Sequence, residues 1–250
     1  MELDTIENIE NYLLSKNINV IVNCAAYTNV DKAEEMEEYD KVNNINVVGV
    51  RNLAEVCDER DLFLIQISTD FVFDGDSNKP YNEEDVCNPI NAYGRSKYYG
   101  ENEVYWCDNH MIIRTAWLYS EFGKNFFKTM LNRINDGLET KVVSDQIGTP
   151  TYARDLARFI IHVLEYDNPY NHIGTYHFTN FPLSAKRYPT AAAFLYSLSI
   201  IFTSYGSRKR RSYSCFNSSL NFGCAIEIIL STLSLIVVPF KFTQPYSVTK

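Results

Sequence analysis

The chain has 250 residues and a formal net charge of −8, with 31 acidic and 23 basic side chains. This balance argues against a nucleic-acid partner, because phosphate binding requires a basic surface, while the length suffices for one large domain or two small ones. No basic and then apolar signal segment opens the sequence, and its six cysteines form no C-x-x-C pair, so a cytoplasmic protein with reduced thiols is expected.

The first predicted elements are a helix and a strand. Residues 5–16 carry apolar side chains at helical spacing, and Asp4 or Thr5 can cap this helix. Residues 20–22, Val-Ile-Val, then predict a strand. This is the middle of an α/β pattern, and no G-x-G-x-x-G loop precedes it. We expect a Rossmann-like, doubly wound parallel sheet that lacks its first strands and glycine loop, which leaves the 20–22 strand with an exposed edge.

Polar or small residues follow the first two predicted strands. The apolar run 62–67 is typical of a buried parallel strand, and Ser68 and Thr69 come where it ends. Ligands of open α/β sheets bind outside the carboxyl ends of the strands. After the first strand, the small Ala25 and Ala26 allow a flat ligand to approach the backbone, although packing is the alternative reason for two alanines there. Residues 31–60, between the two strands, are expected to be helical.

A helix predicted over about residues 93–107 carries Tyr93 and Lys97 four positions apart, which places both on one face. An ammonium beside a phenol favours the phenolate, so a lowered pKa is expected for Tyr93. A tyrosine tuned in this way can exchange a proton with a carbonyl or an alcohol. Thr69 can supply a second hydroxyl to the same oxygen, whereas an idle surface pair is the alternative interpretation.

The α/β pattern continues after residue 107. Part of it, about residues 115–180, is expected to form a small substrate lobe that is interleaved with the main domain. Trp117 ends one of its strands, and an ordinary core tryptophan is the alternative to a binding role there. The predicted elements are strands at 111–114, 142–143 and 174–178 and helices at 125–135 and 153–165.

The composition changes after residue 180. The last segment, 181–250, is serine-rich and holds a single acid, Glu227, against eight basic residues. Three interpretations are open: the product of a shifted reading frame or wrong gene model, a segment with no stable fold, and membrane association. Residues 222–240 are almost long enough to span a bilayer, but Glu227 weakens that interpretation.

Four motif blocks, in order and at suitable spacing, carry a family resemblance. They are Asn23–Glu34, Ser68–Gly75 with the Tyr93-x-x-x-Lys97 set, Arg114–Tyr119 and Asp145–Thr151. Together they resemble the dTDP-4-dehydrorhamnose reductase family, which belongs to the extended short-chain dehydrogenases/reductases of the nucleotide-sugar type. The resemblance covers about residues 2–180.

The resemblance implies NAD(P)H-dependent reduction of the 4-keto group of dTDP-4-dehydro-6-deoxy-L-mannose to dTDP-L-rhamnose. It implies Thr69, Tyr93 and Lys97 as catalytic residues, and Asn46 as a brace for the active-site strand. The implied cofactor contacts are Asp4, Ala25, Ala26, Tyr27, Thr28, Ser68, Tyr93 and Lys97. The implied substrate contacts are Val30, Thr69, Trp117 and Gln146.

The resemblance implies a dTDP-sugar as partner, allows a homodimer and Mg²⁺, and leaves NADPH and NADH both open; no metal ligands are identified in the sequence. A glycine loop normally holds the dinucleotide pyrophosphate, so its absence leaves open a further interpretation, that this chain binds cofactor weakly and is inactive as it stands. The rival function is a non-catalytic, dinucleotide-binding subunit that resembles the regulatory subunit of methionine adenosyltransferase, which shares the Tyr-x-x-x-Lys pattern.

Overall fold

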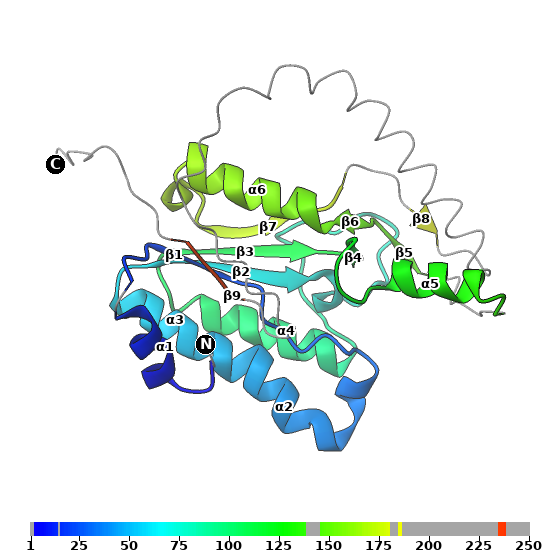
Figure 1. Cartoon of the computed structure of the whole chain (residues 1–250), viewed down its shortest axis with the longest axis horizontal. Helices are drawn as coiled ribbons and strands as arrows, with labels where there is room; N and C mark the ends of the chain where they lie inside the picture. The colour runs from blue at the N-terminus through cyan, green and yellow to red at the C-terminus, as the bar shows by residue number, and fades with distance from the viewer. Residues whose placement is uncertain (1–2, 15, 139–145, 181–184, 187–234, 239–250) are drawn as a thin grey trace. The chain divides into compact units, whose positions relative to one another are not determined.

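The computed structural model of this chain describes residues 3–14, 16–138, 146–180, 185–186 and 235–238 (Figure 1). The chain divides into two compact units, which are described separately. Unit 1 holds Met1–Arg114, Asp167–His177 and Cys224–Lys250, and unit 2 holds Thr115–Tyr166 and Phe178–Gly223. Most of the tail after residue 180, including most of the 222–240 stretch, lies outside the described residues.

A five-stranded sheet, in the order β7-β3-β2-β1-β9, forms the centre of unit 1 (Figure 1). The pairs β1–β2 and β3–β7 are parallel, which confirms the predicted Rossmann-like α/β fold. The edge of β1 expected to be exposed is instead paired with β9, an antiparallel strand from the tail. The strands are β1 (Val20–Asn23), β2 (Phe63–Thr69), β3 (His110–Thr115), β7 (Gly174–His177) and β9 (Leu235–Val238).

Helices of unit 1 cover one face of this sheet (Figure 1). The segment 31–60 is helical as expected, in turns of different type, and a π-helical turn, η3, brings the buried Asn46 side chain to the main chain of Tyr27. The α-helices are α1 (Ile6–Leu13), α2 (Tyr39–Asn43), α3 (Gly49–Glu59) and α4 (Ala92–Val104). The shorter turns are η1 (Lys32–Glu34), η2 (Met36–Glu38), η3 (Asn44–Val48), η4 (Asp70–Val72) and η5 (Pro169–Asn171).

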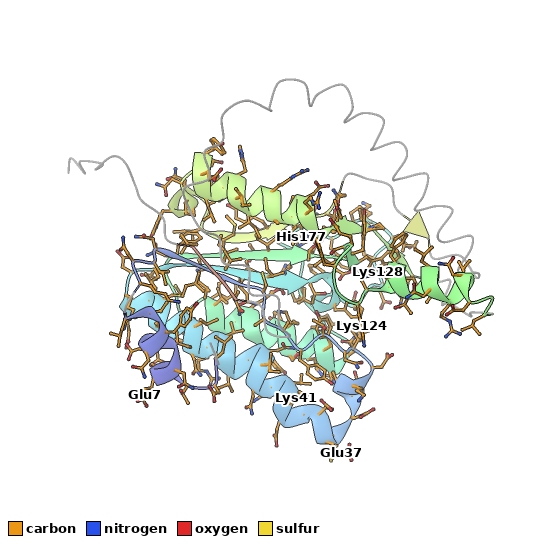
Figure 2. The ribbon with its side chains drawn as sticks, viewed as in Figure 1. Glu7, Glu37, Lys41, Lys124, Lys128 and His177 are labelled. Atoms are coloured by element: carbon orange, nitrogen blue, oxygen red, sulfur yellow. The ribbon has the colours of Figure 1, made fainter. Side chains whose placement is uncertain are left out.

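The core of unit 1 lies between the sheet and helices α1, α3 and α4. It is a cluster of buried apolar side chains, and burial of such area is the dominant favourable term in folding. Its members are Ile9, Leu13, Ile18, Ile21, Val50, Leu53, Ala54, Val56, Cys57, Leu62, Leu64, Val104, Cys107 and Ile112. By contrast, Glu37 is exposed, as expected for a solvated acidic turn, and Lys41 on α2 is exposed as well (Figure 2).

Unit 2 is built from two short strand pairs and two helices. β4 (Leu118–Tyr119) pairs in parallel with β6 (Thr151–Tyr152), and β5 (Ile147–Gly148) pairs antiparallel with β8 (Ala185–Lys186). The helices are α5 (Phe126–Asn135), which Asn125 caps, and α6 (Ala153–Tyr166). The strand expected at 142–143 lies outside the described residues. No helix in the described part of either unit is both long and apolar enough to cross a membrane.

Gly100 provides a test of the contact between α4 and η3. A Cβ atom at Gly100 would lie 2.2 Å from the main-chain oxygen of Asn46. Alanine normally stabilises a helix relative to glycine, but this overlap forces the two elements apart, so Gly100→Ala should lower the free energy of unfolding by roughly 1–3 kcal/mol. Urea denaturation measures the change. The exposed Asn102→Ala on the same helix is the control, and equal stability of the two variants would contradict the close packing.

Candidate active site

The first turn of α4 packs directly on the segment that follows β2. Asn91 caps the helix, since its Oδ1 accepts a hydrogen bond from the Gly94 N–H at 2.7 Å. A Cβ at Gly94 would lie 2.2 Å from the Phe71 main-chain oxygen, so the approach requires glycine. The rings of Phe71 and Tyr93 meet edge to face, with centroids 5.6 Å apart. These contacts bring Tyr93 to the carboxyl end of β2.

Thr69, Tyr93 and Lys97 come together at this strand end, as the sequence predicted. The Tyr93 hydroxyl hydrogen-bonds with Thr69, whose Oγ1 also accepts the Phe71 N–H at 3.2 Å. Lys97 is buried, and its ammonium donates to the main-chain oxygen of Ile67 at 2.8 Å. Two hydroxyls and one ammonium therefore share the end of one parallel strand, the place where open α/β sheets bind ligands.

Burial dominates the titration of both groups. It raises the pKa of Tyr93 to about 12, while the Thr69 hydrogen bond acts to lower it and Asp70 adds to the rise. The predicted lowering of the Tyr93 pKa is therefore wrong for this structure, because loss of water disfavours the phenolate and Lys97 is held by a carbonyl. Burial also lowers the pKa of Lys97 to about 8, against the opposing effects of Glu101 and Cys24.

A buried amide network holds the loop after β1. Asn46 Oδ1 accepts the Tyr27 N–H at 2.8 Å, and its Nδ2 donates to the Tyr27 oxygen at 3.2 Å and to Ser96 Oγ at 2.9 Å. Asn46 thus joins this loop to α4, whereas the family resemblance implied a brace on the active-site strand. Asn23 Nδ2 donates to Gln66 Oε1 at 2.7 Å, a pairing of β1 with β2 that no sequence pattern indicated.

The other residues expected to contact the cofactor and substrate differ in exposure. Ala25 and Tyr27 are buried, Ala26 and Val30 are half-buried, and Thr28 is exposed. Asp4 is exposed before α1, where its Oδ1 accepts from Asn8 Nδ2 at 2.9 Å. The half-buried and exposed members can meet a ligand directly, while Ala25 and Tyr27 shape the loop from within.

A buried charged network, which no sequence pattern indicated, lies next to this set. The Ser68 hydroxyl donates to Glu101 Oε1 at 2.5 Å, so this side chain is engaged inside the protein. Arg114 Nε and NH2 donate to the same carboxylate, at 3.0 Å to Oε1 and 2.7 Å to Oε2, and the guanidinium lies 5.2 Å from the centroid of the Phe73 ring. In the sequence, Glu101 could have been found only by its spacing, because it follows Lys97 by one helical turn.

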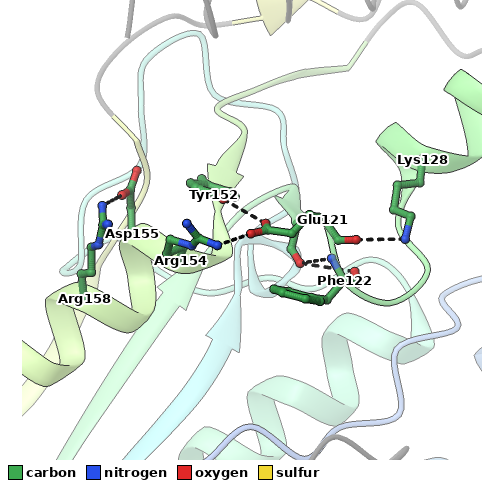
Figure 3. Close-up of polar contacts among 8 residues, drawn as sticks. Glu121, Phe122, Lys128, Tyr152, Arg154, Asp155 and Arg158 are labelled. Atoms are coloured by element: carbon green, nitrogen blue, oxygen red, sulfur yellow. Dashed lines mark hydrogen bonds and ion pairs between the residues drawn. The ribbon is translucent and has the colours of Figure 1, made fainter. Parts of the chain in front are cut away.

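Unit 2 holds the remaining predicted residues. Trp117 is half-buried and has a positive φ of 46°, and its main-chain oxygen accepts the Thr151 N–H at 3.2 Å. Gln146 is exposed and directly precedes β5. Nearby, the Glu121 carboxylate accepts hydrogen bonds from Tyr152 and Arg154, and its main-chain oxygen accepts from Lys128 at 3.1 Å (Figure 3).

Within the described residues, no group of three or more His, Cys, Asp or Glu side chains is arranged to hold a metal ion.

The parallel sheet, together with a Tyr-x-x-x-Lys helix and a threonine at its strand ends, defines a Rossmann-like α/β protein of the short-chain dehydrogenase/reductase type. Residues 1–201 match the RmlD substrate binding domain, and the chain belongs to this family. The match extends past residue 180, where the resemblance was expected to end.

The chain is similar to curated reductases over part of their length. It is 41% identical over 167 residues to a dTDP-4-dehydrorhamnose reductase of Aggregatibacter actinomycetemcomitans, covering 66% of this chain and 56% of the relative. It is 47% identical over 144 residues to a dTDP-4-keto-6-deoxy-D-glucose reductase of Streptomyces niveus, covering 56% and 49%. The chain thus spans about half the length of these relatives.

Solved structures agree with this assignment. A dTDP-4-dehydrorhamnose reductase of Bacillus anthracis in complex with NADP matches with a TM-score of 0.70 and 36% identity, covering 82% of this chain and 69% of that one. The orthologue from Clostridium acetobutylicum matches with a TM-score of 0.68 and 38% identity, over the same shares.

The lowered pKa of Lys97 predicts a pH dependence of stability. The pKa of Lys97 is about 8 in the folded chain against the ordinary lysine value of 10.5, so its burial destabilises the fold fully below pH 8. This penalty disappears as the pH rises from about 8 to 10.5, because in that range Lys97 is protonated in the unfolded chain but neutral in the folded chain. Relative to Lys97→Met, the wild type should gain roughly 3 kcal/mol between those two pH values. Urea denaturation across that range measures it, and parallel curves for the two proteins would refute the buried ammonium.

Glu101→Gln should destabilise unit 1 by about 3–5 kcal/mol, because Arg114 would be left buried without its countercharge. Glu103→Gln is the matched control on the same helix, since Glu103 pairs with the exposed Arg51 and such pairs contribute about 0–1 kcal/mol. Replacing both partners, with Glu101→Leu and Arg114→Met, should recover much of the loss. Equal denaturation midpoints for Glu101→Gln and Glu103→Gln would show that the buried pair contributes no more to stability than the exposed one.

Proposed function

We propose that this protein belongs to a reductase that converts the C4 keto group of dTDP-4-dehydro-6-deoxy-L-mannose to the alcohol of dTDP-L-rhamnose. The observation that carries the proposal is the Tyr93 hydroxyl, hydrogen-bonded to Thr69 beside buried Lys97 at the carboxyl end of β2. The reductase names of the relatives support the same reaction and do not favour the regulatory-subunit alternative.

Tyr93 acts as the proton donor to the alkoxide that forms at C4. With a pKa of about 12, the phenol keeps its proton at neutral pH, which suits a group that must give it up only to a strong base. Thr69 donates a second hydrogen bond to the reacting oxygen. Lys97, held by the main-chain oxygen of Ile67, is the third member of the proposed catalytic set.

The residues at the strand ends fit a nicotinamide dinucleotide. The small Ala26 leaves room beside the main chain after β1, Thr28 offers an exposed hydroxyl, and Lys97 supplies an ammonium for ribose hydroxyls. The nicotinamide, when bound, supplies the hydride. Asp4 and the loop from Ala25 complete the proposed contacts, with Ser68 contributing its main chain. NADPH is favoured over NADH because a solved relative was crystallised with NADP.

For the sugar nucleotide we propose contacts from Val30, Thr69, Trp117 and Gln146. Mg²⁺ finds no support in the described residues, which hold no suitable group of ligands. A homodimer and a cytoplasmic location stay predictions.

Tyr93→Phe should reduce kcat for the dTDP-sugar by about 10²–10⁴-fold, the usual contribution of a positioned proton donor. NADPH binding should change little, since the hydroxyl and not the ring is removed. Loss of NADPH absorbance measures turnover, and nicotinamide fluorescence measures binding. Tyr98→Phe, on the same helix, is the control. Full turnover by Tyr93→Phe would rule out this residue as the donor.

A further inference from the structure

Gly148, in β5, lies directly against the side chain of Trp117. A Cβ built on Gly148 would lie 2.5 Å from Cε2, 2.7 Å from Cζ2 and 2.8 Å from Nε1 of that indole. These are the three nearest atoms, and all belong to the indole of Trp117. The indole therefore occupies the space that any side chain at position 148 would need.

The backbone does not require glycine at this position. The glycines with left-handed φ among the described residues are Gly75, Gly123, Gly137 and Gly174. Gly148 is not one of them, so alanine can adopt its conformation without strain. The reason for glycine here is the ring of Trp117.

Trp117 itself is held in an unfavourable conformation. Its φ of 46° lies in the left-handed region, which large side chains rarely adopt and which persists only where the surroundings impose it. The pairing of β4 with β6 imposes it, through the hydrogen bond from Thr151 to the Trp117 oxygen. The stacked rings of Tyr119 and Tyr152, with centroids 5.5 Å apart, strengthen this pairing.

Glu121 adds side-chain contacts to the same pairing. Its carboxylate accepts from the Tyr152 hydroxyl at 2.9 Å and from Arg154 (Figure 3). The main chain at Trp117 is thus fixed by its hydrogen bond to Thr151, and the ring is confined by Gly148. A strained backbone with a fitted ring is typical of a residue whose orientation has a function.

We propose that Gly148 is a positioning residue, which sets the orientation of the Trp117 indole as a wall for the hexose ring of the sugar nucleotide. This inference rests on the proposed function for its substrate, but not for its geometry. Any side chain at position 148 displaces the indole. Binding of the sugar then weakens, while the proton transfer at Tyr93 is unaffected.

The ring position is measured first, without substrate. The chain has two tryptophans, so Trp106→Phe, at a 78% exposed site, leaves Trp117 as the sole indole emitter. In that background Gly148→Ala should shift the emission maximum and change acrylamide quenching. Ile147→Ala, at the neighbouring 67% exposed position, is the control and should change neither. An unchanged spectrum for Gly148→Ala would overturn the proposal.

Steady-state kinetics then test the role of the ring. Gly148→Ala should raise KM for the dTDP-sugar roughly tenfold with kcat nearly unchanged, as expected when binding of ground and transition state is lost equally. In a Trp117→Phe background, where the smaller ring leaves room for a methyl group, the same substitution should have little further effect. Additive effects of the two substitutions would overturn the proposal.

The outcomes separate the two proposals. If wild type has no activity on the dTDP-sugar while Gly148→Ala still moves the indole, the proposed function fails and the geometric role of Gly148 stands. If wild type is active and Gly148→Ala changes neither KM nor fluorescence, the positioning role fails and the proposed function stands. A general folding defect is recognised because Trp117→Phe would not relieve it.

Discussion

The candidate site depends on the contacts that the buried carboxylate of Glu101 makes with Arg114 and Ser68. Removing a carboxylate from water costs several kcal/mol, which is offset only when charged and polar partners replace the water. Arg114, from the end of β3, and Ser68, from the end of β2, do so here. Because Glu101 sits one turn after Lys97 on α4, the same contact sets how that helix lies across the strand ends.

Close helix packing completes this arrangement. Gly94 brings the start of α4 against Phe71, and Gly100 brings its middle against Asn46. Asn46 in turn hydrogen-bonds the loop after β1. Three segments far apart in the sequence therefore meet at one edge of the sheet. The burial that results keeps Tyr93 protonated and makes Lys97 easier to neutralise, so the packing and the acid–base properties have one cause.

Unit 2 achieves positioning by different means. Its strand pairs are only two residues long, so few main-chain hydrogen bonds hold them. Side chains supply the rest, through stacked tyrosines and the Glu121 network. A strained residue, Trp117, persists in this small unit because its ring and its main chain are each fixed by a separate neighbour.

The sequence by itself determined the parallel α/β fold, the family, and the meeting of Thr69, Tyr93 and Lys97, because these follow from local periodicity and from the rule that strand ends share an edge. It did not predict the π-helical turn at Asn46, the β9 pairing, the Glu101–Arg114 contact, or the fit of Gly148 to Trp117. It also predicted the wrong direction for the Tyr93 pKa. Each of these depends on which distant groups exclude water or occupy space around a residue, and spacing along the chain carries no record of that. Only the tertiary structure, by bringing such groups together, decided them.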